Sequence, residues 1–258
     1  MDQLKVTLVQ SDLHWENRKA NLDHFSSLIA EIKDETDIII LPEMFTTGFS
    51  MAPEQHAETM DGEALAWMKK IAHENNVVVC GSLMMNDHGK FYNRLIWMQA
   101  DGTLRHYDKR HLFRMGDEQL HYTPGNSRMI IEHKGWKILP LICYDLRFPV
   151  WMRRTKEFDY ELAIMVANWP EKRVAHWKAL LQARAIENQC FLAGVNRVGD
   201  DGYKIHYSGE SSLINPKGEI IFQQAGTPFT LTFTLRKDEL IEYRNAFPVI
   251  EDGDNFSL

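Results

Sequence analysis

The sequence alternates short, almost wholly apolar runs with segments of helical periodicity. Residues 37–41 (DIIIL) and 77–85 (VVVCGSLMM) show no polar alternation, which is typical of strands buried on both faces. Residues 17–32 instead repeat apolar side chains at helical spacing, so that one stripe of the predicted helix is apolar. Buried strands of this kind, mixed with hairpins, favour an α/β fold in which two sheets are sandwiched between helices.

The same patterns divide the rest of the chain. They predict helices at 17–32, 63–75 and 171–188, and strands at 5–10, 37–41, 77–85, 91–99, 136–144, 161–167, 190–195, 211–215, 219–223 and 230–235. Turn sequences at 86–89, 101–102 and 215–218 predict hairpins. No linker or repeat interrupts the chain, so we expect one domain over residues 1–258. Residues 241–258, charged and aromatic without clear periodicity, are a candidate tail that packs on a neighbouring subunit.

Charge and cysteine content narrow the class of protein. The formal net charge of −7 and the absence of a long basic run argue against nucleic acid as the main partner, because phosphate binding needs a concentrated basic face. No apolar stretch approaches about 18 residues, and no signal-peptide pattern is present, so we expect no membrane contact. The three cysteines are widely spaced and odd in number, which predicts a reducing, cytoplasmic location. The 11 histidines form no HxxxH or HxH pair, so we expect no metal site.

Cys143 stands where the apolar run 138–142 ends and a polar, aromatic stretch begins. Pro149 is suited to the first turn of a helix. A strand, a sharp turn and a helix would expose Cys143 at the carboxyl edge of the sheet, where α/β proteins bind ligands, and a nearby helix start would favour its thiolate. Most cysteines are small buried hydrophobes, and Cys80 and Cys190 fit that alternative better than Cys143 does.

Two charged residues are candidates to act with this cysteine. Glu43 follows the apolar strand 37–41 and is flanked by apolar residues, so partial desolvation would suit it to general-base work. Lys109 could place an ammonium beside an oxyanion. Taken singly, each has an ordinary alternative as a solvated surface charge.

Three sequence blocks are similar to the nitrilase (carbon–nitrogen hydrolase) superfamily: LPEMFTTGF around Glu43, YDKRHLF around Lys109 and LICYDLRFP around Cys143. They occur in the family's order, and the resemblance covers essentially the whole chain. It implies a Glu43–Lys109–Cys143 catalytic triad and a four-layer α-β-β-α sandwich, assembled as a homodimer or larger. It also implies a second glutamate between the lysine and the cysteine. Glu118 occupies that place, with Asp117 as the alternative.

This resemblance implies thioester chemistry on a small linear amide. Glu43 would take the proton of Cys143, and the thiolate would attack the amide carbon. Lys109 and the backbone N–H of Tyr144 would stabilise the oxyanion, while Glu118 would orient Lys109. Glu43 would then protonate the departing ammonia and activate the water that hydrolyses the thioester. Such a reaction needs no metal or organic cofactor.

Residues 108–126, 143–153, 166–189 and 196–202 resemble the omega-amidase branch more than other branches. That resemblance implies hydrolysis of the terminal amide of short dicarboxylic monoamides, notably 2-oxoglutaramate and 2-oxosuccinamate.

A dicarboxylic substrate needs a cation for its distal carboxylate, and a bidentate arginine is well suited. Arg173 follows a predicted strand end and heads a predicted helix, so it is the first candidate, with Arg110 and Arg114 as alternatives. Trp169 and Phe113 could wall the pocket.

Two neighbouring segments are expected to be structural. Arg147 is predicted to pair with an acidic group beneath the turn at Cys143, and residues 183–188 to pack a helix near the site without doing chemistry.

Other functions remain compatible with the sequence. The same triad could serve N-carbamoyl hydrolysis or a general aliphatic amidase, and nitrile hydrolysis fits the sequence blocks less well. A non-catalytic scaffold with this fold is a further alternative, but a scaffold would have no need of all three candidate residues.

Overall fold

The computed structural model describes residues 3–254. The strands are β1 (Gln3–Gln10), β2 (Ile38–Ile40), β3 (Val78–Asp87), β4 (Lys90–Met98), β5 (Leu104–Asp108), β6 (Ile131–His133), β7 (Trp136–Ile142), β8 (Leu162–Ala167), β9 (Phe191–Asn196), β10 (Val198–Asp200), β11 (His206–Ile214), β12 (Ile220–Ala225) and β13 (Phe229–Arg236). The α-helices are α1 (Arg18–Ala30), α2 (Pro53–His56), α3 (Glu63–Asn75), α4 (Glu118–His121), α5 (Pro149–Met152), α6 (Val174–Asn188) and α7 (Lys237–Ala246). Short 3-10 helices are η1 (Arg114–Gly116), η2 (Cys143–Arg147), η3 (Glu171–Arg173) and η4 (Val249–Asp252). None of the described helices is long and apolar enough to cross a membrane.

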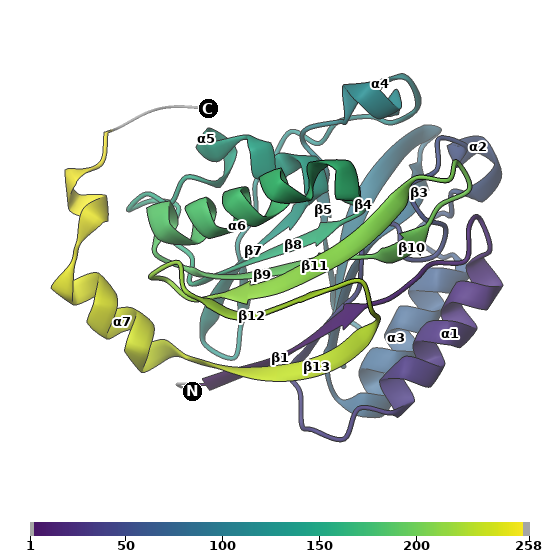
Figure 1. Cartoon of the computed structure of the whole chain (residues 1–258). Helices are drawn as coiled ribbons and strands as arrows, with labels where there is room; N and C mark the ends of the chain where they lie inside the picture. Colours follow the sequence, from purple (N-terminus) through teal and green to yellow (C-terminus); the bar gives the residue numbers. More distant parts are fainter. Residues whose placement is uncertain (1–2, 255–258) are drawn as a thin grey trace.

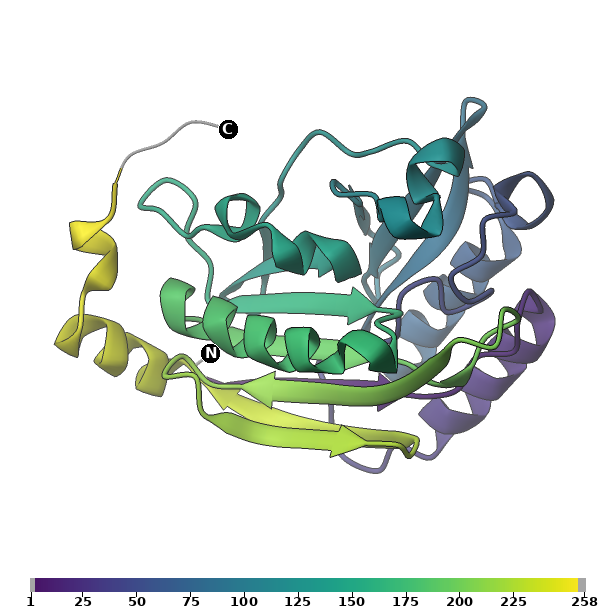
Figure 2. The same ribbon diagram turned by 45° about the horizontal axis from the view of Figure 1, so that its top comes forward.

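These strands form two sheets that pack face to face (Figures 1 and 2). The first has the order β13-β1-β2-β3-β4-β5, and the second has the order β10-β11-β9-β8-β7-β6, with β12 paired to β11. The parallel centres, β1-β2-β3 and β7-β8-β9, are connected through helical segments, while antiparallel strands complete both sheets.

Alternate side chains of the buried strands face different layers, because the side-chain period of a strand is two residues. In β2, Ile38 and Ile40 belong to the core that joins the first sheet to the second, whereas Ile39 belongs to the core beneath α1 and α3. Trp177 and Leu181 of α6 extend the first core on the outer side of the second sheet. The order of layers is therefore α1/α3, first sheet, second sheet, α6, which confirms the predicted four-layer α-β-β-α sandwich (Figure 1).

Most predicted elements and turns are present in the structure. The turn at 86–89 is a two-residue hairpin in which His88 and Gly89 both have positive φ, 51° and 79°. Residues 215–218 likewise connect the paired strands β11 and β12. The strands β5, β6 and β10 were not predicted, since β5 is largely polar and β6 and β10 have only three residues each, without an apolar run.

Several predicted boundaries were wrong. The strand expected over 136–144 ends at Ile142, where η2 begins, and the strand expected over 211–215 begins at His206. The helix expected over 171–188 begins as the 3-10 turn η3 and becomes α-helical only at Val174. The segment 241–258, which shows no clear periodicity, is helical at its start because α7 runs from Lys237 to Ala246. The last part of that segment, 255–258, lies outside the described residues.

Candidate active site

The carboxyl ends of strands from both sheets meet at one place. Glu43 lies three residues after the end of β2 at Ile40, and Lys109 directly follows β5. In the second sheet, Cys143 directly follows β7 and Asn168 directly follows β8. Polar groups at the ends of buried strands are thereby gathered at one edge of the sandwich, where α/β folds bind their ligands.

The ammonium group of Lys109 lies between two carboxylates. Its Nζ is 2.9 Å from Oε1 of Glu43 and 2.9 Å from each oxygen of Glu118, and all three side chains are fully buried. The backbone N–H of Phe113 donates to Oε2 of Glu118 at 2.6 Å. The structure thus places Glu118 against Lys109, whereas the rival Asp117 is exposed, with a φ of 56°.

Glu43 is held from both sheets. Its Oε2 accepts the backbone N–H of Asn168 at 2.7 Å, and its backbone carbonyl accepts the Asn168 side-chain amide at 2.6 Å. From the first sheet, Asn93 Nδ2 donates to Oε1 at 2.8 Å. These hydrogen bonds fix the direction of the carboxylate, which is what a general base requires.

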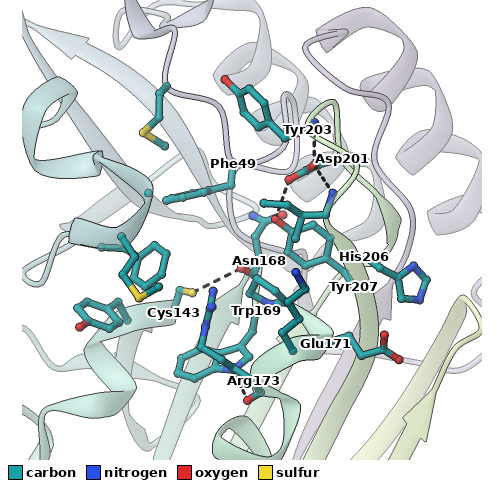
Figure 3. A pocket seen from close by; sticks show the side chains of 18 of the residues that line it. Phe49, Cys143, Asn168, Trp169, Glu171, Arg173, Asp201, Tyr203, His206 and Tyr207 are labelled. Carbon is teal, nitrogen blue, oxygen red and sulfur yellow. Dashed lines mark hydrogen bonds between the residues drawn. The ribbon is translucent and has the colours of Figure 1, made fainter.

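Cys143 occupies a sharp turn beside this cluster. Its φ of 44° lies in the left-handed region, which non-glycine residues rarely adopt. The Asp145 carboxylate holds the turn by accepting the hydroxyl of Tyr107 at 2.8 Å and the backbone N–H of His111 at 3.0 Å. The sulfur lies 4.0 Å from the backbone oxygen of Asn168 and is directed into a pocket (Figure 3). As predicted, a proline follows at the start of a helix, in α5.

The electrostatics of the cluster keep the proton on Cys143. Burial, and then the charge of Glu43, raise the pKa of the Cys143 thiol, while Lys109 opposes this rise. Burial disfavours the charge on Lys109, but Glu118 and Glu43 more than offset it, so the pKa of Lys109 is raised and the ammonium persists. The prediction that the turn would favour the thiolate was wrong, because burial beside a carboxylate outweighs one short helical turn. Proton removal therefore requires a base.

A cavity of about 490 Å³ opens over Cys143 (Figure 3). Four residues predicted from the sequence line it: Phe113, Tyr144, Trp169 and Arg173. The alternatives Arg110 and Arg114 are exposed and lie outside its lining. Among residues 3–254, no three His, Cys, Asp or Glu side chains are grouped to hold a metal ion.

Arg147 does not have its predicted partner. The acidic group beneath the turn, Asp145, is already bound by uncharged donors and by the ring nitrogen of His111. The Arg147 guanidinium instead lies 4.8 Å from the centre of the Trp169 ring and 3.0 Å from Nδ1 of His176, and it lines the cavity. The predicted ion pair with an acidic group beneath the turn is therefore replaced by contacts to an aromatic ring and a histidine.

Residues 183–188 form the last part of α6, and they support the turn at Cys143. Nε of the buried Arg184 donates to the backbone oxygen of Leu146 at 3.1 Å. This contact ties α6 to η2, consistent with the packing position predicted for the segment.

Sequence reasoning missed three parts of the site. Asn93 and Asn168 bind Glu43, and residues 201–207 in the β10–β11 hairpin form one wall of the cavity. The available signal for Asn93 was an amide within the predicted strand 91–99, because buried polar groups require partners. Nothing local signalled the hairpin, since its contribution depends on how β11 joins the second sheet.

Comparison with known proteins identifies the family. The sequence profile of the carbon–nitrogen hydrolases matches residues 5–245. The chain belongs to the carbon–nitrogen hydrolase family.

Two curated carbon–nitrogen hydrolases show how extensive the similarity is. The chain is 48% identical to "Omega-amidase YafV" of Escherichia coli K12 over 259 aligned residues, which cover 100% of both chains. It is 32% identical to "2-oxoglutaramate amidase" of Bacillus subtilis strain 168, with 96% of each chain covered.

A solved carbon–nitrogen hydrolase has nearly the same fold. XC1258 of Xanthomonas campestris, described as a CN-hydrolase superfamily protein with an arsenic adduct in its active site, is 42% identical and superposes with a TM-score of 0.98 over 100% of both chains. The family assignment and the predicted nitrilase-like fold are thus both confirmed, and the protein is a carbon–nitrogen hydrolase.

Proposed function

We propose that this carbon–nitrogen hydrolase is an omega-amidase, which hydrolyses the terminal amide of 2-oxoglutaramate and 2-oxosuccinamate to the dicarboxylic acid and ammonia. The observation that carries the proposal is the 48% identity, over the full length, to a protein named omega-amidase. The similarity to a 2-oxoglutaramate amidase supports the same substrate class.

The first half of the proposed reaction forms a thioester. Glu43 accepts the Cys143 proton, and the sulfur attacks the amide carbon to give a tetrahedral oxyanion. Lys109 and the backbone N–H of Tyr144 stabilise this oxyanion, and each preorganised donor contributes about 3–4 kcal/mol. The carbon–nitrogen bond then breaks, and the proton on Glu43 passes to the nitrogen, which leaves as ammonia.

The second half of the reaction restores the enzyme. Glu43 removes a proton from water, and the resulting hydroxide attacks the thioester carbon. The carbon–sulfur bond breaks, the acid leaves, and Cys143 recovers its proton. Glu118, hydrogen-bonded to Lys109 through both oxygens, keeps the ammonium in position during both halves.

Two arginines in the cavity wall suit the distal carboxylate of such a substrate. The Arg173 guanidinium lies 5.2 Å from the centre of the Phe113 ring, and that of Arg147 lies over Trp169. Within the described part of the chain, these groups contact aromatic rings and a histidine rather than a carboxylate. Such guanidinium groups remain available for bidentate recognition of an anion.

The assembly and location of the protein are part of the same proposal. We infer one domain that works as a cytoplasmic homodimer. Three buried free thiols fit a reducing compartment. The exposed apolar side chains of Ile241 on α7 and of Phe247 directly after it suit the contact with a neighbouring subunit that was predicted for this segment.

The proposed activity is tested by ammonia release from purified protein. We expect rapid release from 2-oxoglutaramate, and much slower release from glutamine, N-carbamoyl-β-alanine and a simple nitrile. Release from N-carbamoyl-β-alanine alone would keep the catalytic residues and contradict the proposed substrate. No release from any compound, together with a Cys143 that is inert to alkylation, would contradict catalysis itself.

The proposed binding of the distal carboxylate by Arg173 is tested by Arg173→Met. This change keeps an unbranched apolar stem and removes the guanidinium, so we expect KM for 2-oxoglutaramate to rise about 10- to 100-fold, the loss of one charge-assisted contact. A neutral linear amide should be hydrolysed as before. Arg114→Met, outside the cavity, is the matched control. Equal effects on neutral and anionic amides would show that Arg173 does not bind the carboxylate.

A further inference from the structure

Asn93 contacts every charged member of the catalytic cluster. It lies in β4 and is almost fully buried. Its Nδ2 donates to Oε1 of Glu43 at 2.8 Å and to Oε1 of Glu118 at 3.2 Å. Its backbone oxygen accepts the N–H of Lys109 at 2.9 Å. One residue in the first sheet thereby links both carboxylates to the strand end that carries the ammonium.

The orientation of the Asn93 amide is held by hydrogen bonds at both of its ends. The Ser82 hydroxyl accepts the backbone N–H of Met44 at 2.8 Å and donates to Asn93 Oδ1 at 2.8 Å. With Oδ1 used as the acceptor, both protons of Nδ2 point to the carboxylates. The residue after Glu43 thus orients the amide that binds Glu43.

We propose that Asn93 is a positioning residue that binds the Glu43 and Glu118 carboxylates and directs Glu43 for proton transfer from Cys143. The proposal rests on the catalytic roles proposed above. A donor to a carboxylate favours its ionised form, whereas burial and a second nearby carboxylate favour protonation. A protonated Glu43 could not accept the proton of the Cys143 thiol. Asn93 supplies one N–H to each carboxylate and so favours the form of the pair that can accept a proton.

Other ionisable groups also face this pair and contribute to its titration. Lys109 follows β5, and Cys143 begins the turn after β7. Tyr122 follows α4, and Tyr207 lies in β11. Of these four groups, only Lys109 carries a positive charge. Asn93 is an uncharged donor from the first sheet that binds the same two carboxylates as Lys109. The pH dependence of the Cys143 reaction rate therefore reports on the coupled cluster as a whole and not on one carboxylate.

The test replaces the amide by an apolar side chain of similar size, Asn93→Leu. Iodoacetamide alkylation of Cys143 is followed by peptide mass spectrometry from about pH 5 to about pH 9. We expect the acid limb of the alkylation rate to move to higher pH by about one unit. At neutral pH, kcat/KM should fall about 10- to 100-fold, the loss of a hydrogen bond to a charged group.

Asn188→Leu is the matched control. Asn188 is also a buried asparagine, but it serves the end of α6, where it accepts the N–H of Arg154 at 2.8 Å and donates to the oxygen of Arg184 at 2.9 Å. We expect this variant to lose stability and to keep the wild-type pH limb. A general loss of packing would not shift the pH dependence of the alkylation rate in either variant. A shift found only in Asn93→Leu therefore reports on the carboxylates.

Two outcomes would overturn the proposal: an Asn93→Leu protein with the wild-type limb, or an equal shift in Asn188→Leu. If Asn93→Leu does not fold, the same measurement on Ser82→Ala tests the proposal. This variant keeps the Asn93 amide but removes the hydroxyl that orients it. A smaller shift in the same direction supports the proposal, and an unchanged limb overturns it. Alkylation needs no substrate, so this result is independent of whether 2-oxoglutaramate is hydrolysed.

Discussion

Cys143→Ala is expected to lower kcat for amide hydrolysis by a factor on the order of 10⁴ to 10⁶, as is typical when a covalent nucleophile is removed. Without the sulfur no thioester forms, and the donors that remain can only polarise the amide. The fold should persist, since the hydrogen bond from Sγ to the backbone oxygen of Asn168 is long, at 4.0 Å, and removal of the sulfur costs about 1 kcal/mol. Ammonia release and urea denaturation measure the two quantities.

Thiol labelling supplies the control for this prediction. Burial raises the pKa of Cys190 to about 12 and also raises that of Cys80, and neither thiol lies beside a base or lines the cavity. Iodoacetamide should therefore modify Cys143 much faster than the other two. Full activity in Cys143→Ala, or faster labelling of Cys80 or Cys190, would exclude the thioester mechanism.

Lys109→Met is expected to affect both activity and stability. It removes a buried cation and leaves the carboxylates of Glu43 and Glu118 facing each other without a counter-charge. Breaking a buried ion pair in this way costs about 3–5 kcal/mol of unfolding free energy. The loss of one oxyanion donor should lower kcat by a factor on the order of 10² to 10³. Lys156→Met, at an exposed ion pair with Glu251, is the matched control and should leave the unfolding midpoint unchanged.

The loss of unfolding free energy in Lys109→Met should depend on pH. The direction of this dependence is set by the carboxyl groups that have lost their counter-charge. Burial, and then the charge of Glu43, raise the pKa of Glu118 even in the wild type, where Lys109 opposes the rise. Without the cation, the folded state binds protons more tightly than the unfolded state. Its stability therefore increases as the pH falls and decreases as the pH rises through the folded-state pKa. The deficit relative to wild type should be smaller at about pH 5 than at about pH 8, and a larger deficit at the lower pH would contradict this account.

Arg147 and Asp145 show why neighbours in sequence can mislead. Both lie in η2, and the sequence suggested that an arginine there would pair with an acid beneath the turn. Asp145 turns inward to Tyr107, while Arg147 faces the cavity. Residues two apart in a 3-10 helix lie on different sides, because the helix has three residues per turn, and the sequence did not show that η2 would form.

The sequence by itself determined which residues end the buried strands. Glu43 and Cys143 were identifiable because apolar runs stop locally, and a polar residue soon after such a run lies at a sheet edge in an α/β arrangement. Lys109 lies in a polar stretch, and only the family resemblance marked it. The family resemblance added their order and a second glutamate. Hairpins with turn residues such as His88-Gly89 were also local, because two successive positive φ values require suitable residue types.

Only the tertiary structure decided how these residues meet. Burial distinguished Glu118 from the exposed Asp117 as the second glutamate's position. Asn93 belongs to the site because β4 brings its side chain to both carboxylates. Glu43 receives donors from both sheets, so its geometry exists only once the sandwich has closed. The physical reason is the range of the interactions: strand ends and turns follow from neighbouring residues, whereas distances between charges and burial follow from contacts between segments far apart in the chain.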